Sequence, residues 1–157
     1  MAAYTIAYTA PINQDQFESK LTQDQVWTYI DLKAHHAEKF TPTITSSEIL
    51  QASEDCDFFT RQVYFAPDSH PMGLTVAVEN RWLYQPCWVK YRTDDRRNIV
   101  DMISTGSAGE LLYTSVVEWR HPNIRPNSIA AKDKEKEDRD TTIATMHRMA
   151  QDTKETK

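Results

Sequence analysis

The sequence predicts one α+β domain made of an antiparallel sheet, two short N-terminal helices and a long C-terminal helix. Three observations predict it: an early strand precedes a helical stretch, strand-like segments fill the middle of the chain, and a charged helical segment follows them. Short connections between the strand-like segments favour antiparallel neighbours. A chain of 157 residues can bury the core of one domain without disulfides or a metal.

The N-terminal elements have clear local signals. Residues 4–10 alternate in the manner of a strand. Thr22 and Gln25 form a capping box, in which the threonine oxygen accepts from an exposed amide and the glutamine side chain reciprocates. Apolar residues follow at helical spacing over residues 26–34. We expect this helix to end soon afterwards and a second short turn to run to Phe40.

Strand-like segments continue up to residue 120, separated by turn residues such as proline, glycine, aspartate and serine. They predict an antiparallel meander of six further strands. The expected strands are Thr45–Gln51, Phe58–Phe65, Thr75–Leu83, Trp88–Thr93, Asn98–Ser104 and Glu110–Trp119.

The last helix is expected to follow Ser128, a plausible N-cap residue. Residues 132–140 are almost entirely charged, so this half should face solvent. The second half has apolar spacing and should dock on the sheet through Ile143, Met146, His147 and Ala150. We expect the domain to span residues 1–150 and residues 151–157 to form a frayed tail.

Composition excludes several classes of partner. The net charge of −5 and the lack of a basic stripe argue against nucleic acid. No segment is long and apolar enough for a membrane span, and the N-terminus lacks the features of a signal peptide, so we expect a soluble, cytoplasmic protein. Cys56 and Cys87 are expected to be free thiols. Metal-ligand spacings and dinucleotide fingerprints are missing, so we expect neither a metal nor a cofactor.

Four short segments carry a resemblance to a known family. They are Leu21-Thr-Gln-Asp-Gln-Val-Trp27, Ala37-Glu-Lys-Phe40, Thr60-Arg-Gln-Val-Tyr-Phe65 and Gly109-Glu-Leu111. Together with the order of elements, they resemble the AtaL-like proteins of bacteria and fungi, several of which are encoded beside secondary-metabolite genes. These proteins are part of the START and birch-pollen-allergen (SRPBCC) superfamily. The resemblance covers residues 4 to 149 and implies a helix-grip fold, in which a curved sheet wraps the last helix around a cavity.

Arg61 and Glu79 form the sharpest candidate pair for a site. A symmetric hairpin between their strands places them directly opposite each other. A second hairpin, centred at residues 85–86, would bring Arg92 opposite Glu79 as well. The pair could orient a ligand oxygen at the cavity, or it could be a salt bridge on the sheet surface. Within residues 74–82 the apolar side chains are at even-numbered positions, which puts Glu79 on the opposite face of the strand. This placement conflicts with a role for the pair at the cavity.

Glu118 and His147 are the candidates for acid/base chemistry. Glu118 lies on the last strand, and His147 lies on the apolar face of the last helix. In an apolar pocket either group can acquire a pKa near neutrality and move a proton. The alternatives are that Glu118 faces solvent and His147 borders the core.

The resemblance implies a cavity whose occupant is a small hydrophobic molecule, expected to contact Phe40, Phe59, Glu79, Tyr113, Trp119 and Met146. The first hypothesis is a cofactor-free enzyme that cyclises, isomerises or eliminates from a polyketide-like metabolite. In it Arg61 polarises an oxygen while Glu118 or His147 moves the proton. The second hypothesis is a non-catalytic carrier or sensor. In the third, residues 132–140 form a protein-interaction surface, although a solvated helix face also explains them.

Overall fold

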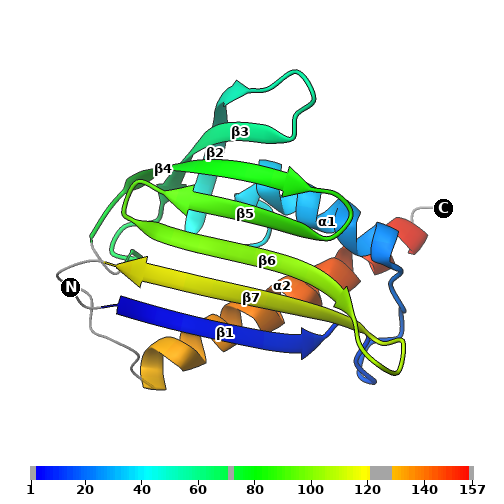
Figure 1. Ribbon diagram of the computed structural model, residues 1–157. Coiled ribbons are helices and arrows are strands. Elements are labelled where there is room, and N and C mark those ends of the chain that lie inside the picture. The colour runs from blue at the N-terminus through cyan, green and yellow to red at the C-terminus, as the bar shows by residue number, and fades with distance from the viewer. Residues whose placement is uncertain (1–2, 71–72, 121–128, 156–157) are drawn as a thin grey trace.

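The computed structural model describes residues 3–70, 73–120 and 129–155, and it shows one seven-stranded antiparallel sheet with two α-helices (Figure 1). The strand order is β1-β7-β6-β5-β4-β3-β2. The strands are β1 (Ala3–Pro11), β2 (Ile44–Ala52), β3 (Phe58–Phe65), β4 (Val76–Tyr84), β5 (Trp88–Thr93), β6 (Arg97–Thr105) and β7 (Leu111–Arg120). The helices are α1 (Gln23–His35), the 3₁₀ helix η1 (Ala37–Lys39) and α2 (Ile129–Glu155).

The start of α1 follows the predicted capping box. Thr22 Oγ1 accepts from the Gln25 amide, and the Gln25 side chain accepts from the Thr22 amide at 2.8 Å. This reciprocal pair satisfies two amides that otherwise lack helical partners. The helix buries Val26, Trp27 and Ile30 against the sheet and ends at His35, before η1.

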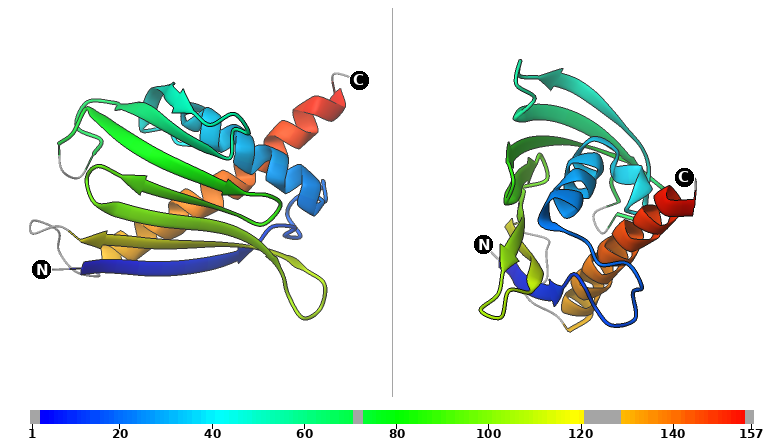
Figure 2. Two further views of the ribbon diagram at one scale, coloured as in Figure 1. Left: turned by 45° about the horizontal axis from the view of Figure 1, so that its top comes forward. Right: turned by 90° about the vertical axis from the view of Figure 1, so that its right-hand side faces the viewer.

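Both α-helices lie on the same face of the sheet, as Figure 2 shows in the right-hand view. Helix α2 crosses behind β1, β7 and β6, and the strands β2 and β3 curl around the far side of α1 (Figures 1 and 2). The main core lies between the sheet and these helices, and it includes Val26, Phe59, Tyr113, Ile143 and Met146. The arrangement is the helix-grip fold expected from the sequence.

The predicted elements agree with the observed ones to within a residue or two at most boundaries. Helix α2 continues to Glu155, beyond the expected start of the tail at residue 151. The expected N-cap Ser128 lies outside the described residues. Among the helices that the structure describes, none is long and apolar enough to cross a membrane.

Candidate functional site

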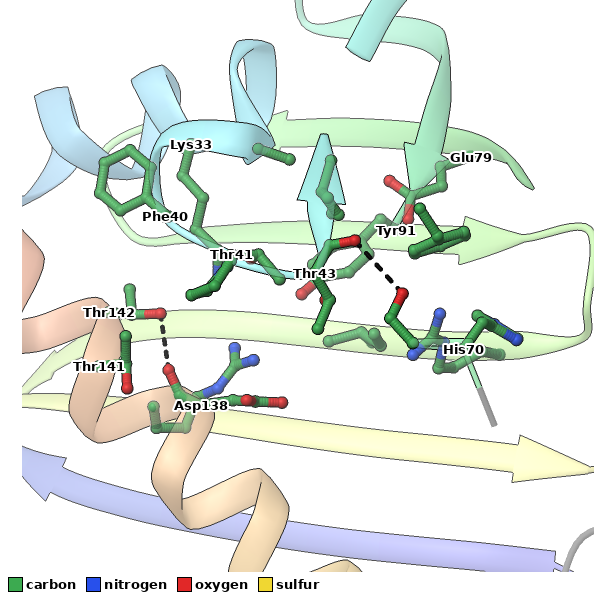
Figure 3. Close-up of a pocket in the computed structure, with 18 of the residues that line it drawn as sticks. Lys33, Phe40, Thr41, Thr43, His70, Glu79, Tyr91, Asp138, Thr141 and Thr142 are labelled. Atoms are coloured by element: carbon green, nitrogen blue, oxygen red, sulfur yellow. Dashed lines mark hydrogen bonds between the residues drawn. The ribbon is translucent and has the colours of Figure 1, made fainter. Parts of the chain in front are cut away.

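A cavity of about 310 Å³ lies between the first half of α2, the sheet and the segment that joins α1 to β2 (Figure 3). One wall is apolar and is formed by Ala37, Phe40, Ile44, Phe65 and Ile99. The cavity is also bordered by a set of buried charged residues, which we call the charged cluster. Its members are at most 7% exposed: Lys33, Arg61, Glu79, Arg81, Asp101 and Arg139. All except Asp101 line the cavity directly.

Arg61 and Glu79 are paired across β3 and β4, as the hairpin register predicted. Arg61 Nε donates to Glu79 Oε2 at 2.7 Å, and a terminal nitrogen lies 2.7 Å from the same oxygen. Both side chains are buried, so the pair is not a salt bridge on the sheet surface. The other terminal nitrogen of Arg61 donates to the backbone carbonyls of Lys33 and Ala34. Arg61 therefore fastens the end of α1 to the sheet, and most of its donors are already used.

On β4 the apolar residues and Glu79 were expected on opposite faces, and the structure shows which face lies inside. The odd-numbered residues Ala77, Glu79, Arg81 and Leu83 face the helices, whereas the apolar even-numbered residues face outwards. The predicted position of Arg92 is wrong, because the β4–β5 register differs by one residue. Glu79 pairs with Thr93, and Arg92 pairs with Asn80 and is exposed. A shift of one residue moves a side chain to the other face of a sheet.

Asp101 of β6 contacts four other elements beside the cavity. Its Oδ1 accepts from Arg139 of α2 at 3.0 Å and from Ser115 of β7 at 2.7 Å. Its Oδ2 accepts from the Tyr91 hydroxyl at 3.1 Å and lies 3.6 Å from Lys33 Nζ. Burial alone would raise the pKa of Asp101, but Lys33 and Arg139 more than offset it, so the pKa lies below its ordinary value. The carboxylate is therefore ionised and holds α1 and α2 against the sheet.

Lys33 is a buried amine with a strongly shifted pKa. Burial and the nearby guanidinium of Arg139 lower its pKa from 10.5 to about 8, and Arg61 acts in the same direction. Asp101 opposes this shift. Lys33 points from the last turn of α1 and lines the cavity (Figure 3). An amine of this kind can both donate a hydrogen bond and release a proton near neutral pH.

Arg81 has unused donor capacity beside the cavity. Its guanidinium lies 3.9 Å above the centre of the Tyr91 ring, and one terminal nitrogen donates to Glu79 at 3.0 Å. Its Nε is buried and has no hydrogen-bond partner. The Nε of Arg139 is in the same condition. Buried donors without acceptors are uncommon and costly, so these two atoms mark the cluster as incomplete.

His70 lines the far end of the cavity and is also buried. Its Nε2 lies 3.2 Å from Asp95 Oδ2. Burial and the nearby charge of Arg97 lower the pKa of His70 from its ordinary value of 6.5, against the opposing effect of Asp95. The imidazole is therefore mainly neutral at pH 7. Asp95 is itself fixed by Thr93 Oγ1, and its backbone carbonyl accepts from Trp119 Nε1 at 2.9 Å.

The other predicted contact residues divide between the cavity and the core. Phe40 and Glu79 line the cavity. The side chains of Phe59, Tyr113, Trp119 and Met146 belong to the packed core and are not among the lining residues. The structure therefore does not bring them to this cavity, and their contact with a ligand stays a prediction.

The two predicted proton carriers also lie away from the cavity. His147 is buried, stacks on Phe17 with ring centroids 4.0 Å apart, and has Nε2 2.7 Å from the Ile12 carbonyl. It packs in the core, in agreement with the alternative interpretation that His147 borders the core. Glu118 is half-buried and alternates with the inward residues Val117 and Trp119, so it lies on the outer face of the sheet. Neither group lines this cavity, and a catalytic role for either stays a prediction.

Sequence reasoning missed Lys33, Arg81, Asp101 and Arg139, although each lies in phase with buried neighbours. Asp101 alternates with Ile99 and Ile103 on one face of β6. Arg139 precedes Ile143 and Met146 by four and seven residues on α2, a spacing that puts all three on one helix face. The apolar periodicity of α1, β6 and α2 could have placed Lys33, Asp101 and Arg139 on inward faces, whereas that of β4 points to the face opposite Arg81.

Metal-ligating side chains do not gather anywhere in the described part of the chain: it contains no group of three or more His, Cys, Asp or Glu residues placed to hold an ion. Cys56 and Cys87 are free and exposed. The side chains that line the cavity carry amine, guanidinium, imidazole, carboxylate and hydroxyl groups.

The class of protein is thus defined by its fold: a helix-grip domain with a cavity between its last helix and its sheet. The family described as acetylaranotin biosynthesis cluster protein L (AtaL) matches residues 6–157, and the chain belongs to it. The protein of that name from Aspergillus terreus (strain NIH 2624 / FGSC A1156) is 26% identical over 134 residues, which cover 85% of this chain and 77% of the relative.

Solved structures with the same fold include Ara h 8.0201 and an aromatase/cyclase. Ara h 8.0201 has a TM-score of 0.65 at 10% identity, with 94% of this chain and 97% of that chain covered. The ZhuI aromatase/cyclase from Streptomyces sp. R1128 also has a TM-score of 0.65, at 11% identity, with 95% of this chain and 94% of that chain covered. At these identities the likeness concerns the fold.

Proposed function

We propose that this protein binds an oxygen-bearing intermediate of secondary metabolism in its cavity and catalyses a cofactor-free acid/base reaction on it. The observation that carries the proposal is the charged cluster beside an open cavity. Buried charges reduce stability unless they are fully paired, and a fold does not need them. The family's link to a biosynthetic cluster supports a small-molecule role, and the aromatase/cyclase fold supports cyclisation or isomerisation by analogy.

The lining supplies a base and a set of hydrogen-bond donors for such a reaction. His70 is neutral and can accept a proton from a carbon next to a ligand carbonyl. The electrons of the broken C–H bond then form a C=C bond, and the carbonyl oxygen becomes an enolate oxygen. Lys33 and Arg81 can donate to that oxygen as its charge develops. An enolate formed in this way is the starting point of aldol-type cyclisation and of double-bond isomerisation.

Deuterium exchange tests this chemistry without knowledge of the natural substrate. The probe is 2-tetralone, a two-ring ketone, incubated with the protein in heavy water and followed by NMR at the carbons next to the carbonyl. We expect the wild-type protein to accelerate exchange and His70→Gln to lose the acceleration while still binding the probe. If the wild-type protein binds 2-tetralone but does not accelerate its deuterium exchange, catalysis is contradicted. The hypothesis of a non-catalytic carrier or sensor would then remain.

A pair of matched variants tests whether the cavity is the site. Thr141 lies beside the cavity on α2, so Thr141→Phe should fill it and remove both binding and exchange. Thr28 is exposed on α1 and is not among the lining residues, so Thr28→Phe should behave as wild type. Equal binding by the two variants would show that the probe binds elsewhere and would overturn the proposal.

A further inference from the structure

The charged cluster contains more positive than negative charge. Its cations are Lys33, Arg61, Arg81 and Arg139, and its carboxylates are Glu79 and Asp101. Asp95, the partner of His70, does not reduce this excess of positive charge, because it also pairs with Arg97 at 3.6 Å. Within the described buried residues around the cavity, two positive charges are therefore left without a buried counter-charge. Such an arrangement is costly unless something else supplies the missing negative charge.

The acidic residues of α2 at the cavity compensate this excess incompletely. Glu137 is exposed, so solvent and salt screen its charge. Glu135 is half-buried and is not among the cavity-lining residues; burial raises its pKa, and its charge acts favourably on Arg139 only after that of Asp101. Asp138 is half-buried and acts on Lys33 more weakly than Arg139 or Asp101 do. The buried side chains around the cavity therefore include more cations than carboxylates.

Two further observations show where the missing negative charge would fit. The Nε atoms of Arg81 and Arg139 are buried donors without an acceptor, so these guanidinium groups are not saturated by the protein. Lys33 has only Asp101 as an ion-pair partner among the described residues, at 3.6 Å, and Asp101 is already shared with Arg139. Phe40, Ile44 and Phe65 supply an apolar part of the same lining.

We infer that the cavity is built for an amphipathic organic anion, with a carboxylate or enolate head held by Lys33, Arg81 and Arg139 and an apolar body against Phe40, Ile44 and Phe65. This inference rests on the proposed ligand-binding function and names the class of ligand. An anionic head completes the charged cluster, and charge-assisted hydrogen bonds to it are stronger than those to a neutral group. Arg61 adds positive charge to the cluster, but its hydrogen bonds are used to hold the end of α1 against the sheet.

A matched pair of probes tests the inference by calorimetry and NMR: 2-naphthoate and 2-naphthamide share one shape and differ in charge. We expect the carboxylate to bind at least about tenfold more tightly, the difference between a charged and a neutral hydrogen-bond partner. Lys33→Met and Arg81→Met should reduce this preference. Arg148 is exposed on α2, so Arg148→Met removes one positive charge far from the cavity lining and should keep it.

Proton uptake gives a second readout. Lys33 faces Asp101 on β6, Arg61 on β3, and Arg139 and Asp138 on α2. A bound anion adds a further negative neighbour and raises the pKa of the amine. Binding of 2-naphthoate near pH 8 should therefore take up protons in the wild-type protein, and in Lys33→Met it should not.

The outcomes separate the inference from the proposed function. Equal affinity for the two probes, with both blocked by Thr141→Phe, would overturn the anion inference and leave the cavity as a binding site. A loss of preference in Arg148→Met equal to that in Lys33→Met would also overturn it. Non-specific attraction between the carboxylate probe and positive charge on the protein would then explain the preference. Inorganic phosphate bound as tightly as 2-naphthoate would overturn the role of the apolar wall. Binding of neither probe would count against the cavity itself.

Discussion

The two halves of helix α2 lie against the same sheet but meet it in different ways. The second half inserts Ile143, Met146 and His147 into a packed core, where each is at most 5% exposed. The first half reaches the sheet through Arg139, which spans to Asp101 beside a cavity. The packed half supplies stability through apolar burial. The first half lies beside charged side chains and a cavity, an arrangement that is less stabilising than apolar packing. It leaves polar groups available to contact a ligand.

The largest effect should come from removing the anchor of the charged half. Asp101→Asn leaves Arg139 and Lys33 buried without their counter-charge, which should lower the free energy of unfolding by about 3–5 kcal/mol. Urea denaturation measures this directly. Combining it with Lys33→Met should recover part of the loss, because one unpaired cation is then removed. A loss below about 1 kcal/mol would mean that Asp101 does not anchor α2.

A cavity-creating change should weaken the packed half without affecting the site. Met146 is fully buried, and Met146→Ala should cost about 3 kcal/mol through lost contacts and the space left behind. Affinity for 2-naphthoate in the folded protein should not change, because Met146 is not among the cavity-lining residues. Denaturation and calorimetry on the same variant test both statements. A joint loss of stability and affinity would show that the two halves are coupled.

The charged half should also carry a distinctive pH dependence. The pKa of Lys33 is about 8 in the folded protein and 10.5 ordinarily, so the unfolded chain binds more protons between these values. The free energy of unfolding should therefore rise with pH in this window, by up to about 1.4 kcal/mol per pH unit from this one group. Lys33→Met should lack this rise. Parallel pH profiles for the two proteins would contradict the shifted pKa.

The smallest effect is expected on the outer face of the sheet. Glu118→Gln makes the same carboxylate-to-amide change as Asp101→Asn, on the adjacent strand but facing away from the helices. It should change stability by less than about 0.5 kcal/mol and leave binding and deuterium exchange as in wild type. Lost exchange with retained binding would restore Glu118 as a candidate acid or base.

The sequence was sufficient for the elements because each has a local signal. The capping box at Thr22 and the alternation within each strand act over a few residues, and the Arg61–Glu79 pairing depends only on the centre of one hairpin. The faces of β4 could not be assigned in this way, because its outer face carries the apolar side chains and its inner face carries Glu79 and Arg81. The polar inner face is the part of the strand that belongs to the site.

The charged cluster could not be assembled from local patterns. Lys33, Asp101 and Arg139 come from α1, β6 and α2, and no short-range rule places them together. Their contacts depend on where α2 crosses the sheet, which in turn depends on the packing of its second half. His147 illustrates the same limit, because its contact with the Ile12 carbonyl joins residues far apart in the sequence.

The pairing of β1 with β7 has a consequence for how the chain folds. Ala3 lies opposite Arg120 and Pro11 opposite Leu112, so the two strands are separated by most of the chain. Strands β2 to β7 can form as successive hairpins, but β1 must wait for β7 before it finds a partner. Because closing so long a loop is entropically costly, this step should slow refolding. During synthesis on the ribosome, β1 emerges before the other strands and lacks its partner until β7 has been made.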